Sequence, residues 1–174
     1  TYAVTNYISD VMALLAQEEV ARFISIGTSM GGIMTMLMAQ FAPEKIAGAV
    51  LNDIGPVVDP QGIEGIRSYL GKGGSFPTWM HAARSLEEAH GASHPSFDTN
   101  DWLGMAKRTM TLCNNGRIAF DYDMKIADPF NDADKNAVPP DLWPGFDALA
   151  DKPLVLVRGA LSTLLSADTL SEMQ

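Results

Sequence analysis

Residues 23–32 read Phe-Ile-Ser-Ile-Gly-Thr-Ser-Met-Gly-Gly, a short apolar run that ends in a cluster of small residues. The segment that follows, 32–41, is apolar on nearly every side, which is typical of a buried helix. Pro43 ends this helix, and residues 47–51 form a second short apolar run. Strand, turn, buried helix and strand within about 30 residues predict a βαβ unit, and therefore a parallel sheet covered by helices on both faces.

The turn between the first strand and the helix carries Gly27-Thr28-Ser29-Met30-Gly31, which fits the pattern G-x-S-x-G. In such a turn a serine stands on a sharp strand-to-helix bend, and its neighbours must lack side chains because their Cβ atoms would collide. We expect the Ser29 hydroxyl to rise above the sheet edge as a nucleophile. The N–H of Met30, at the positive end of the helix, would stabilise an oxyanion. The alternative is a tight turn that uses small residues without any catalytic role.

The rest of the chain adds one further strand, several helices and a large insertion. Helices are expected over 2–17, 80–90, 102–112 and 166–173, a strand over 154–157, a turn at Asn115-Gly116 and a linker over 128–140. We therefore divide the chain into a first core part (1–56), a mostly helical insertion (57–140) and a returning core part (141–174). The fold class is α/β, with a mostly parallel sheet, helices on both faces and the helical insertion.

Composition and charge exclude several classes of protein. The 174 residues carry 12 basic and 21 acidic side chains, a net charge of −9, so phosphate backbones and anionic membranes are repelled. We expect no nucleic-acid partner and no membrane partner. No apolar run in the sequence approaches the roughly 20 residues that span a bilayer. The single cysteine, Cys113, cannot form an internal disulfide, which favours a reducing compartment such as the cytoplasm.

Three stretches of the sequence resemble the α/β-hydrolase superfamily, most of all its capped bacterial members. They are I-S-I-G-T-S-M-G-G (24–32), A-P-E-K-I-A-G-A-V-L-N-D-I-G-P (42–56) and K-P-L-V-L-V-R-G (152–159). The resemblance covers essentially the whole chain and implies that the three apolar runs are strands five, six and seven of that fold. It also implies that residues 57–140 are a cap over the active site, and that neither cofactor nor metal is required.

One departure from the family pattern concerns the catalytic acid. Family members usually place it after strand seven in a sequence such as R-G-x-x-S-D, whereas Thr163 stands at that position here. Some members place the acid at the end of strand six instead, and Asp53 occupies that place, 24 residues after Ser29. The alternative for Asp53 is a structural aspartate that accepts backbone N–H bonds and shapes the next loop. Asp168 is a weaker candidate.

A second departure concerns the catalytic base. The chain order serine, acid, histidine requires a histidine after an eighth strand, and the sequence ends at Gln174 without one. His81, His90 and His94 all fall in the insertion, where surface or packing roles are expected. We therefore interpret the sequence as a central fragment of a longer hydrolase, which shows no turnover alone and whose histidine lies beyond Gln174.

Metal and calcium sites are weakly supported by the sequence. His90 and His94 have the i, i+4 spacing of a helical metal site, but Gly91 and Pro95 disfavour a helix there. Residues 132–143 begin like a calcium loop but lack its glycine and its final glutamate, so we reject that site.

Three functions remain open at this point. The preferred one is a serine hydrolase of carboxylic esters or related small apolar acyl compounds, with Ser29 and Asp53 as catalytic residues. The second is an inactive hydrolase-like binding module, which Thr163 favours. The third is a nucleotide-binding α/β domain, but the glycines run G-x-x-x-G-G, and no lysine follows for a phosphate loop.

Overall fold

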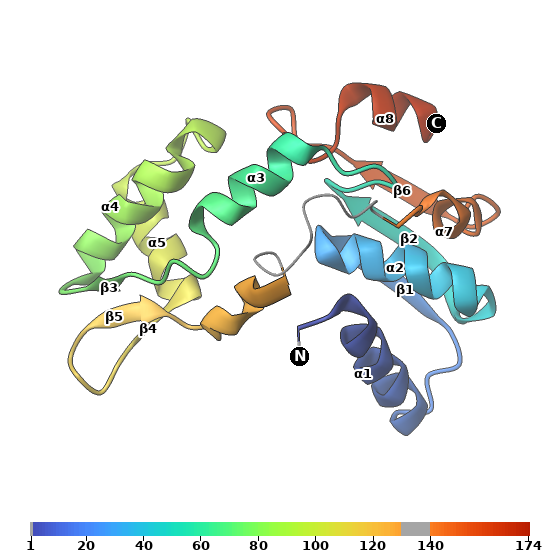
Figure 1. Ribbon diagram of the computed structural model, residues 1–174, viewed down its shortest axis with the longest axis horizontal. Coiled ribbons are helices and arrows are strands. Elements are labelled where there is room, and N and C mark those ends of the chain that lie inside the picture. Colours follow the sequence, from blue (N-terminus) through green and yellow to red (C-terminus); the bar gives the residue numbers. More distant parts are fainter. Residues whose placement is uncertain (1, 130–139) are drawn as a thin grey trace. The chain divides into compact units, whose positions relative to one another are not determined.

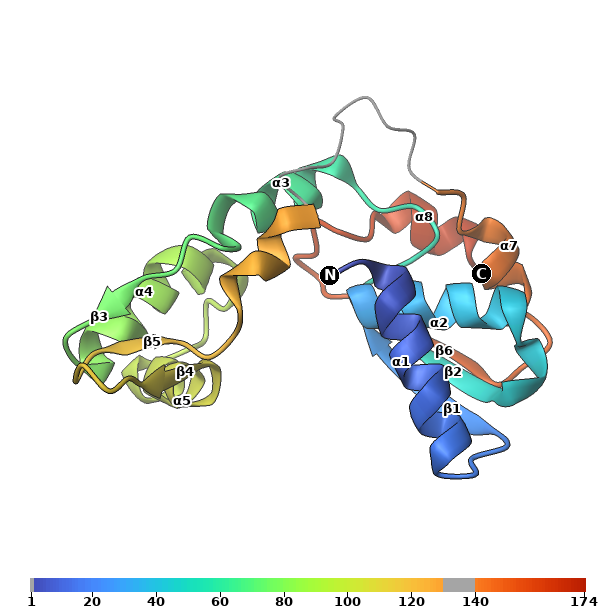
Figure 2. The ribbon, with the colours of Figure 1, turned by 60° about the horizontal axis from the view of Figure 1, so that its bottom comes forward.

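The computed structural model describes residues 2–129 and 140–174 of the chain (Figures 1 and 2). These residues divide into two compact units, one formed by 2–64 with 140–174 and the other by 65–129. The first boundary lies eight residues later than the one predicted at 57. Most of the predicted linker, and the start of the pattern that we rejected as a calcium loop, lie outside the described residues. No helix of the described chain is long and apolar enough to cross a membrane.

The first unit contains a parallel three-stranded sheet. Its strands are β1 (Phe23–Thr28), β2 (Ile46–Asn52) and β6 (Leu154–Val157), in the order β1-β2-β6. Both pairs are parallel, so the βαβ unit predicted from the apolar runs is confirmed. In this order β2 lies between its two neighbours, and the carboxyl ends of all three strands meet at one edge of the sheet.

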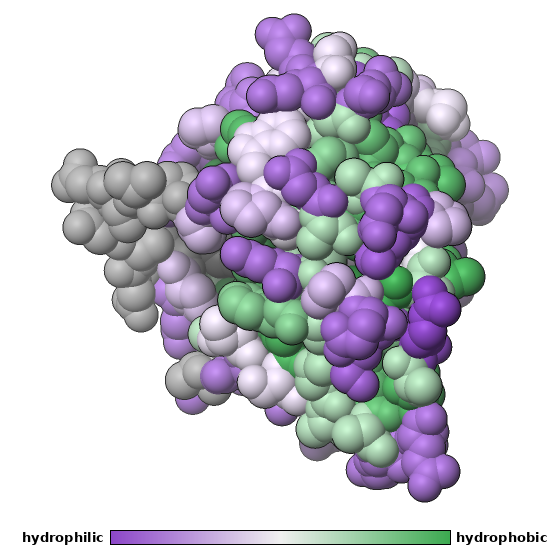
Figure 3. All heavy atoms as spheres, turned by 90° about the vertical axis from the view of Figure 1, so that its right-hand side faces the viewer, coloured by the Kyte–Doolittle hydropathy of each residue, from purple (hydrophilic) through white to green (hydrophobic). Residues whose placement is uncertain are grey.

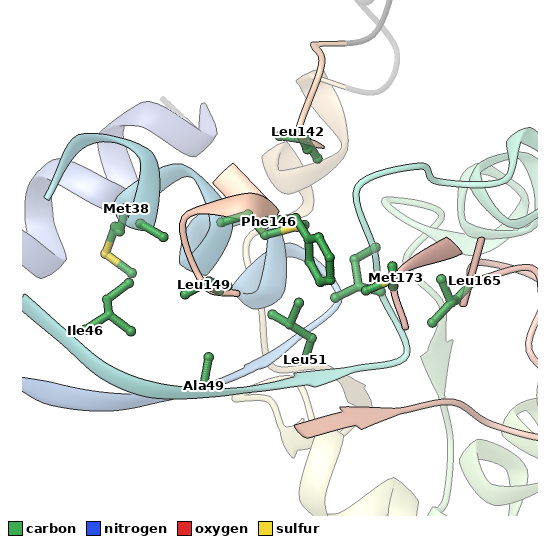
Figure 4. Close-up of a cluster of buried hydrophobic side chains, with 12 residues drawn as sticks. Met38, Ile46, Ala49, Leu51, Leu142, Phe146, Leu149, Leu165 and Met173 are labelled. Carbon is green, nitrogen blue, oxygen red and sulfur yellow. The ribbon is translucent and has the colours of Figure 1, made fainter. Parts of the chain in front are cut away.

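Helices of this unit pack on one face of the sheet and close a hydrophobic core (Figure 4). They are α1 (Val4–Gln17), α2 (Met30–Phe41) and α7 (Trp143–Asp147), with α8 (Ala167–Glu172) near the C-terminus. Met36 of α2 is fully buried, and a Cβ at Gly145 of α7 would lie 2.4 Å from the Met36 carbonyl oxygen, so the two helices are in close contact. Helix α2 is not buried all round as predicted, because Phe41 at its end is 77% exposed.

The opposite face of the sheet is apolar and open among the described residues. Ile24 and Ile26 of β1 are 69% and 76% exposed, and Val155 and Val157 of β6 are also exposed. The register places Ile26 beside Val50 and Val50 beside Val155, so these side chains form one row across the sheet. Apolar surface is open elsewhere too, as Figure 3 shows on the side where α7 lies in Figure 1. The described part of the chain therefore leaves sheet surface that a complete core would bury.

A hydrogen-bonded pair of hydroxyls, one of them buried, joins β1 to α2. The Thr35 hydroxyl, which is fully buried, donates a hydrogen bond to the Gly31 carbonyl (2.8 Å) and lies 2.7 Å from Ser25 Oγ. Because the Thr35 proton is used on Gly31, Ser25 donates in the second bond. The pair ties the first turn of the helix to the middle of the strand.

Replacing Thr35 with valine keeps the shape of the side chain and leaves the Ser25 hydroxyl without this acceptor. We expect Thr35→Val to lower the free energy of unfolding of the full-length protein by about 1–3 kcal/mol, as urea denaturation would measure. The double variant Ser25→Ala/Thr35→Val removes both polar groups and should lose less. An unchanged unfolding midpoint in Thr35→Val would contradict this account.

The second unit combines helices with a small antiparallel sheet. Its elements are α4 (Trp79–His90), α5 (Thr99–Thr109), β3 (Ser75–Phe76), β4 (Met110–Leu112), β5 (Ile118–Phe120) and the short turns η2 (Gly91–Ser93) and η3 (Met124–Ala127). Helix α3 (Pro60–Tyr69) spans the boundary between the units, and η1 (Pro43–Lys45) precedes β2 in the first unit. The order β3-β5-β4 is held by antiparallel pairs, and Trp102 of α5 is buried in the core of this unit.

This sheet was not predicted from the sequence, and one predicted helix extends into it. The predicted helix over 102–112 ends at Thr109, and the next three residues form β4. The predicted turn at Asn115-Gly116 is confirmed, with Gly116 at φ +75° between β4 and β5. Strands of two or three residues are too short for an alternating pattern to separate them from helix.

Candidate functional site

Ser29 occupies a strained turn between β1 and α2. Its backbone has φ 51° and ψ −120°, a conformation that a residue with a Cβ rarely adopts. Its carbonyl oxygen accepts hydrogen bonds from the N–H groups of Gly32 (2.9 Å) and Ile33 (3.2 Å), which start the helix. The Ser29 side chain makes no capping bond to the helix and is partly exposed. Ser29 thus stands at the end of β1 with a side chain that does not cap α2.

The glycines around Ser29 are not equally constrained. A Cβ at Gly27 would lie 2.5 Å from the Gly31 carbonyl oxygen, so Gly27 allows the first turn of α2 to approach the strand. A Cβ at Gly31 would meet nothing within 4 Å among the described residues, so the collision that we expected there is not found. The crowded position is instead Gly32, where a Cβ would overlap the side chain of Ile54. The G-x-S-x-G pattern does not include that residue.

The two glycines of the pattern therefore offer a matched pair of variants. We expect Gly27→Ala to lower the free energy of unfolding by about 1–3 kcal/mol or to prevent folding, because the helix would have to move. Gly31→Ala should leave stability within about 1 kcal/mol of the wild type or raise it, since alanine favours the helix. Urea denaturation of both full-length variants measures the difference. Equal losses of stability in the two variants would contradict the close contact between Gly27 and the first turn of α2.

The N–H of Met30, the residue after Ser29, is the first N–H of α2. The first N–H groups of a helix have no partner within the helix and carry its partial positive charge. An oxygen that gains negative charge near Ser29 would be stabilised by this group. The structure thus places the predicted oxyanion donor next to the predicted nucleophile along the chain.

Asp53 lies at the end of β2, in a second left-handed turn with φ 57°. Its N–H donates to the Val157 carbonyl (2.7 Å), and its Oδ1 accepts from the Gly159 N–H (2.9 Å). The side chain is partly exposed. One carboxylate oxygen is therefore oriented by the backbone that follows β6, as both the catalytic and the structural interpretations of this aspartate require.

The loop after β6 contains the two other positions considered for an acid. Thr163 is exposed in this loop, and Asp168 is exposed in the first turn of α8. The Arg158 guanidinium donates to the Leu165 carbonyl (2.7 Å), and Ser162 Oγ accepts from the Leu165 N–H (3.2 Å). The loop thus has an ordered conformation, although a threonine stands where the family pattern has aspartate.

The three histidines lie in the second unit and have partners there. His81 Nδ1 is 2.8 Å from the Thr78 hydroxyl at the start of α4, and His94 Nδ1 is 3.2 Å from the His90 carbonyl oxygen. The His90 ring packs edge-on against Tyr69, and burial, with a smaller effect of His94, lowers the pKa of His90 below its usual value. Helix α4 ends at His90, so His90 and His94 do not share one helix. The described residues contain no group of three or more potential metal ligands.

Sequence reasoning missed one polar pair at the edge of the sheet. Asn52 Nδ2 donates to the hydroxyl of Thr28 (3.1 Å), and these residues directly precede Asp53 and Ser29. The sequence does show a polar residue at the end of each of the two apolar strands, and this pattern could have indicated the pair. Only the parallel register shows that the two residues are partners.

Three features together define the class of fold. The sheet is parallel with helices packed against it, the chain between its second and third strands forms a separate unit, and a serine stands on a strained strand-to-helix turn. The chain has the fold of the α/β hydrolases to which it is similar. No protein-family model matches the chain.

Three individual proteins are similar to this chain. An α/β hydrolase of known structure from Novosphingobium aromaticivorans is 55% identical, with a TM-score of 0.92 over 99% of this chain and 61% of that one. A 3-hydroxybutyrate-oligomer hydrolase from Cupriavidus necator is 32% identical over 99% of this chain and 60% of that protein. A putative hydrolase from Rickettsia typhi, 24% identical, shares the fold with a TM-score of 0.83 and is covered over 57% of its length. The chain thus spans about three fifths of the length of these relatives.

Proposed function

We propose that this chain carries the nucleophile of a serine hydrolase that cleaves carboxylic esters or related small apolar acyl compounds. The observation that carries the proposal is the strained turn at Ser29, with φ 51° between a parallel strand and a helix. Strain of this kind persists only where the surrounding structure maintains it, and it concentrates at functional sites. The hydrolase names of the similar proteins support the same class of reaction.

In the proposed reaction, Ser29 Oγ transfers its proton to a histidine and attacks the carbonyl carbon of the ester. The N–H of Met30 donates to the oxygen that becomes negative in the tetrahedral intermediate. The intermediate then expels the alcohol, which takes the proton from the histidine. Water, deprotonated by the same histidine, attacks the acyl-enzyme; the intermediate then releases the carboxylic acid, and the histidine returns the proton to Ser29 Oγ. We place this histidine beyond Gln174.

We assign the role of catalytic acid to Asp53. Its Oδ1 is oriented by the Gly159 N–H, and its second oxygen could accept from an imidazole N–H. A carboxylate there would hold the tautomer of the histidine and stabilise its protonated form. The alternative, a structural aspartate without contact to a histidine, predicts a different response to Asp53→Asn, which the Discussion describes.

The second unit, residues 65–129, would act as the cap that selects the substrate. Its position between β2 and β6 along the chain supports this proposal. Esters of 3-hydroxybutyrate are the first substrates to assay, because the relative from Cupriavidus necator is named as a hydrolase of such oligomers. We further expect a small-molecule substrate, no cofactor and a cytoplasmic location.

A fluorophosphonate probe on the full-length protein tests the proposal. We expect covalent labelling of one serine, found on the peptide that contains Ser29, together with hydrolysis of short-chain p-nitrophenyl esters. As the probe is added, turnover should fall in parallel with the rise in the labelled fraction. A full-length protein that neither reacts with the probe nor hydrolyses any ester would instead support the inactive binding module.

A further inference from the structure

Thr28 and Asn52 form a hydrogen-bonded pair at the edge where β1 and β2 end, and neither residue has a role in the reaction described above. We infer that this pair is a positioning device that holds the Ser29 turn in register with the Asp53 turn. The inference rests on the proposed function, since it assigns the pair an effect on the same nucleophile. Thr28 and Asn52 would be positioning residues that act through their neighbours.

The main-chain bond at this place is long. The Ser29 N–H donates to the Asn52 carbonyl over 3.4 Å, whereas N–H···O bonds in proteins are typically 2.9–3.0 Å. The side-chain bond from Asn52 Nδ2 to the Thr28 hydroxyl, at 3.1 Å, lies beside it and joins the same two strands. The side-chain bond therefore adds a second link between the two strands beside this long main-chain contact.

The residues on either side of this pair are the ones under strain. Ser29 follows Thr28 with φ 51°, and Asp53 follows Asn52 with φ 57°. A left-handed conformation of a residue with a side chain persists only when its surroundings hold it. A bond between the residues that precede the two turns limits the movement of both.

The other side of β2 is held more tightly. The Asp53 N–H donates to the Val157 carbonyl over 2.7 Å, and the Gly159 N–H donates to Asp53 Oδ1 over 2.9 Å. Asp53 is thus bound firmly to the end of β6, while the Ser29 turn is bound to β2 through the longer contact. The bond between Thr28 and Asn52 would therefore limit the movement of the Ser29 turn relative to the Asp53 turn.

Thr28→Val tests the inference because valine keeps the branched shape and removes the acceptor. On the full-length enzyme we expect kcat to fall about tenfold with KM unchanged, because a displaced nucleophile slows the chemical step more than binding. Thr28→Ser restores an acceptor and should recover most of kcat. Asn52→Ala should lower kcat by a similar factor, and the double variant should fall no further than either single variant. Thr5→Val, the same exchange at an exposed position of α1, is the matched control and should behave as wild type.

The outcomes separate this inference from the proposed function. A wild-type protein without esterase activity or probe labelling would overturn the proposed function and the inference with it. An active wild type in which Thr28→Val and Asn52→Ala keep full kcat would overturn only the positioning role. The positioning role would also be overturned if the losses of kcat add in the double variant, or if Thr28→Ser does not recover kcat. In either case the two side chains would act independently of the bond between them.

Discussion

Ser29→Ala is expected to abolish covalent labelling by a fluorophosphonate and to lower kcat for ester hydrolysis at least about 10⁴-fold. Alanine lacks the oxygen that attacks the carbonyl, and no other group at this turn can replace it. The strained backbone is retained, because alanine has a Cβ like serine and the bonds from the Ser29 carbonyl to Gly32 and Ile33 involve only the main chain. The measurement is steady-state hydrolysis of a p-nitrophenyl ester together with mass spectrometry of the labelled protein.

Two controls make this result interpretable. Ser9→Ala removes an exposed hydroxyl of α1 that donates to the Thr5 carbonyl, and it should leave labelling and kcat unchanged. The unfolding midpoint of Ser29→Ala in urea should stay close to that of the wild type. If Ser29→Ala folds normally and still hydrolyses esters at the wild-type rate, the nucleophile is another residue.

Asp53→Asn is expected to produce the second large effect, a fall in kcat of about 10³–10⁴-fold. The amide oxygen of asparagine can still accept from the Gly159 N–H, so the turn after β2 keeps its bond. In the proposed mechanism, the variant loses the negative charge that orients the imidazole and stabilises its protonated form. The pH dependence of kcat/KM and the unfolding midpoint should be measured on the same preparation. A variant that keeps its stability and nearly all of its kcat would show that Asp53 is structural.

Thr163→Asp gives the complementary test of where the acid lies. Thr163 is exposed in the ordered loop after β6, so a carboxylate can be placed there without displacing core packing. In the wild-type background we expect no gain in kcat, because Asp53 already supplies the charge. In the Asp53→Asn background Thr163→Asp should recover part of the lost kcat. A large gain in the wild-type background would instead show that the acid position is vacant in this protein.

Periodicity along the sequence was sufficient for the strands of the first unit and for α1, α2 and α8, but it did not predict α7. The predicted strand 154–157 coincides with β6, and the predicted helix 2–17 contains α1. Apolar runs bounded by Gly27 and Pro43 were enough to place β1, α2 and β2 in order. These signals are local, since each depends on residues within one or two turns of a helix or one strand. The short strands of the second unit carried no such signal and were missed.

For the candidate site, the sequence by itself determined which serine stands on the turn and that an aspartate follows the next strand. Tertiary structure alone decided which glycine is crowded, because the group that excludes a side chain at Gly32 belongs to Ile54, far along the chain. It also decided that Gly159, 106 residues from Asp53, donates to that carboxylate. The spacing of residues in a sequence predicts which of them are neighbours within one helix or strand. Contacts at the edge of a parallel sheet join different strands, and the number of residues between those strands follows no fixed period.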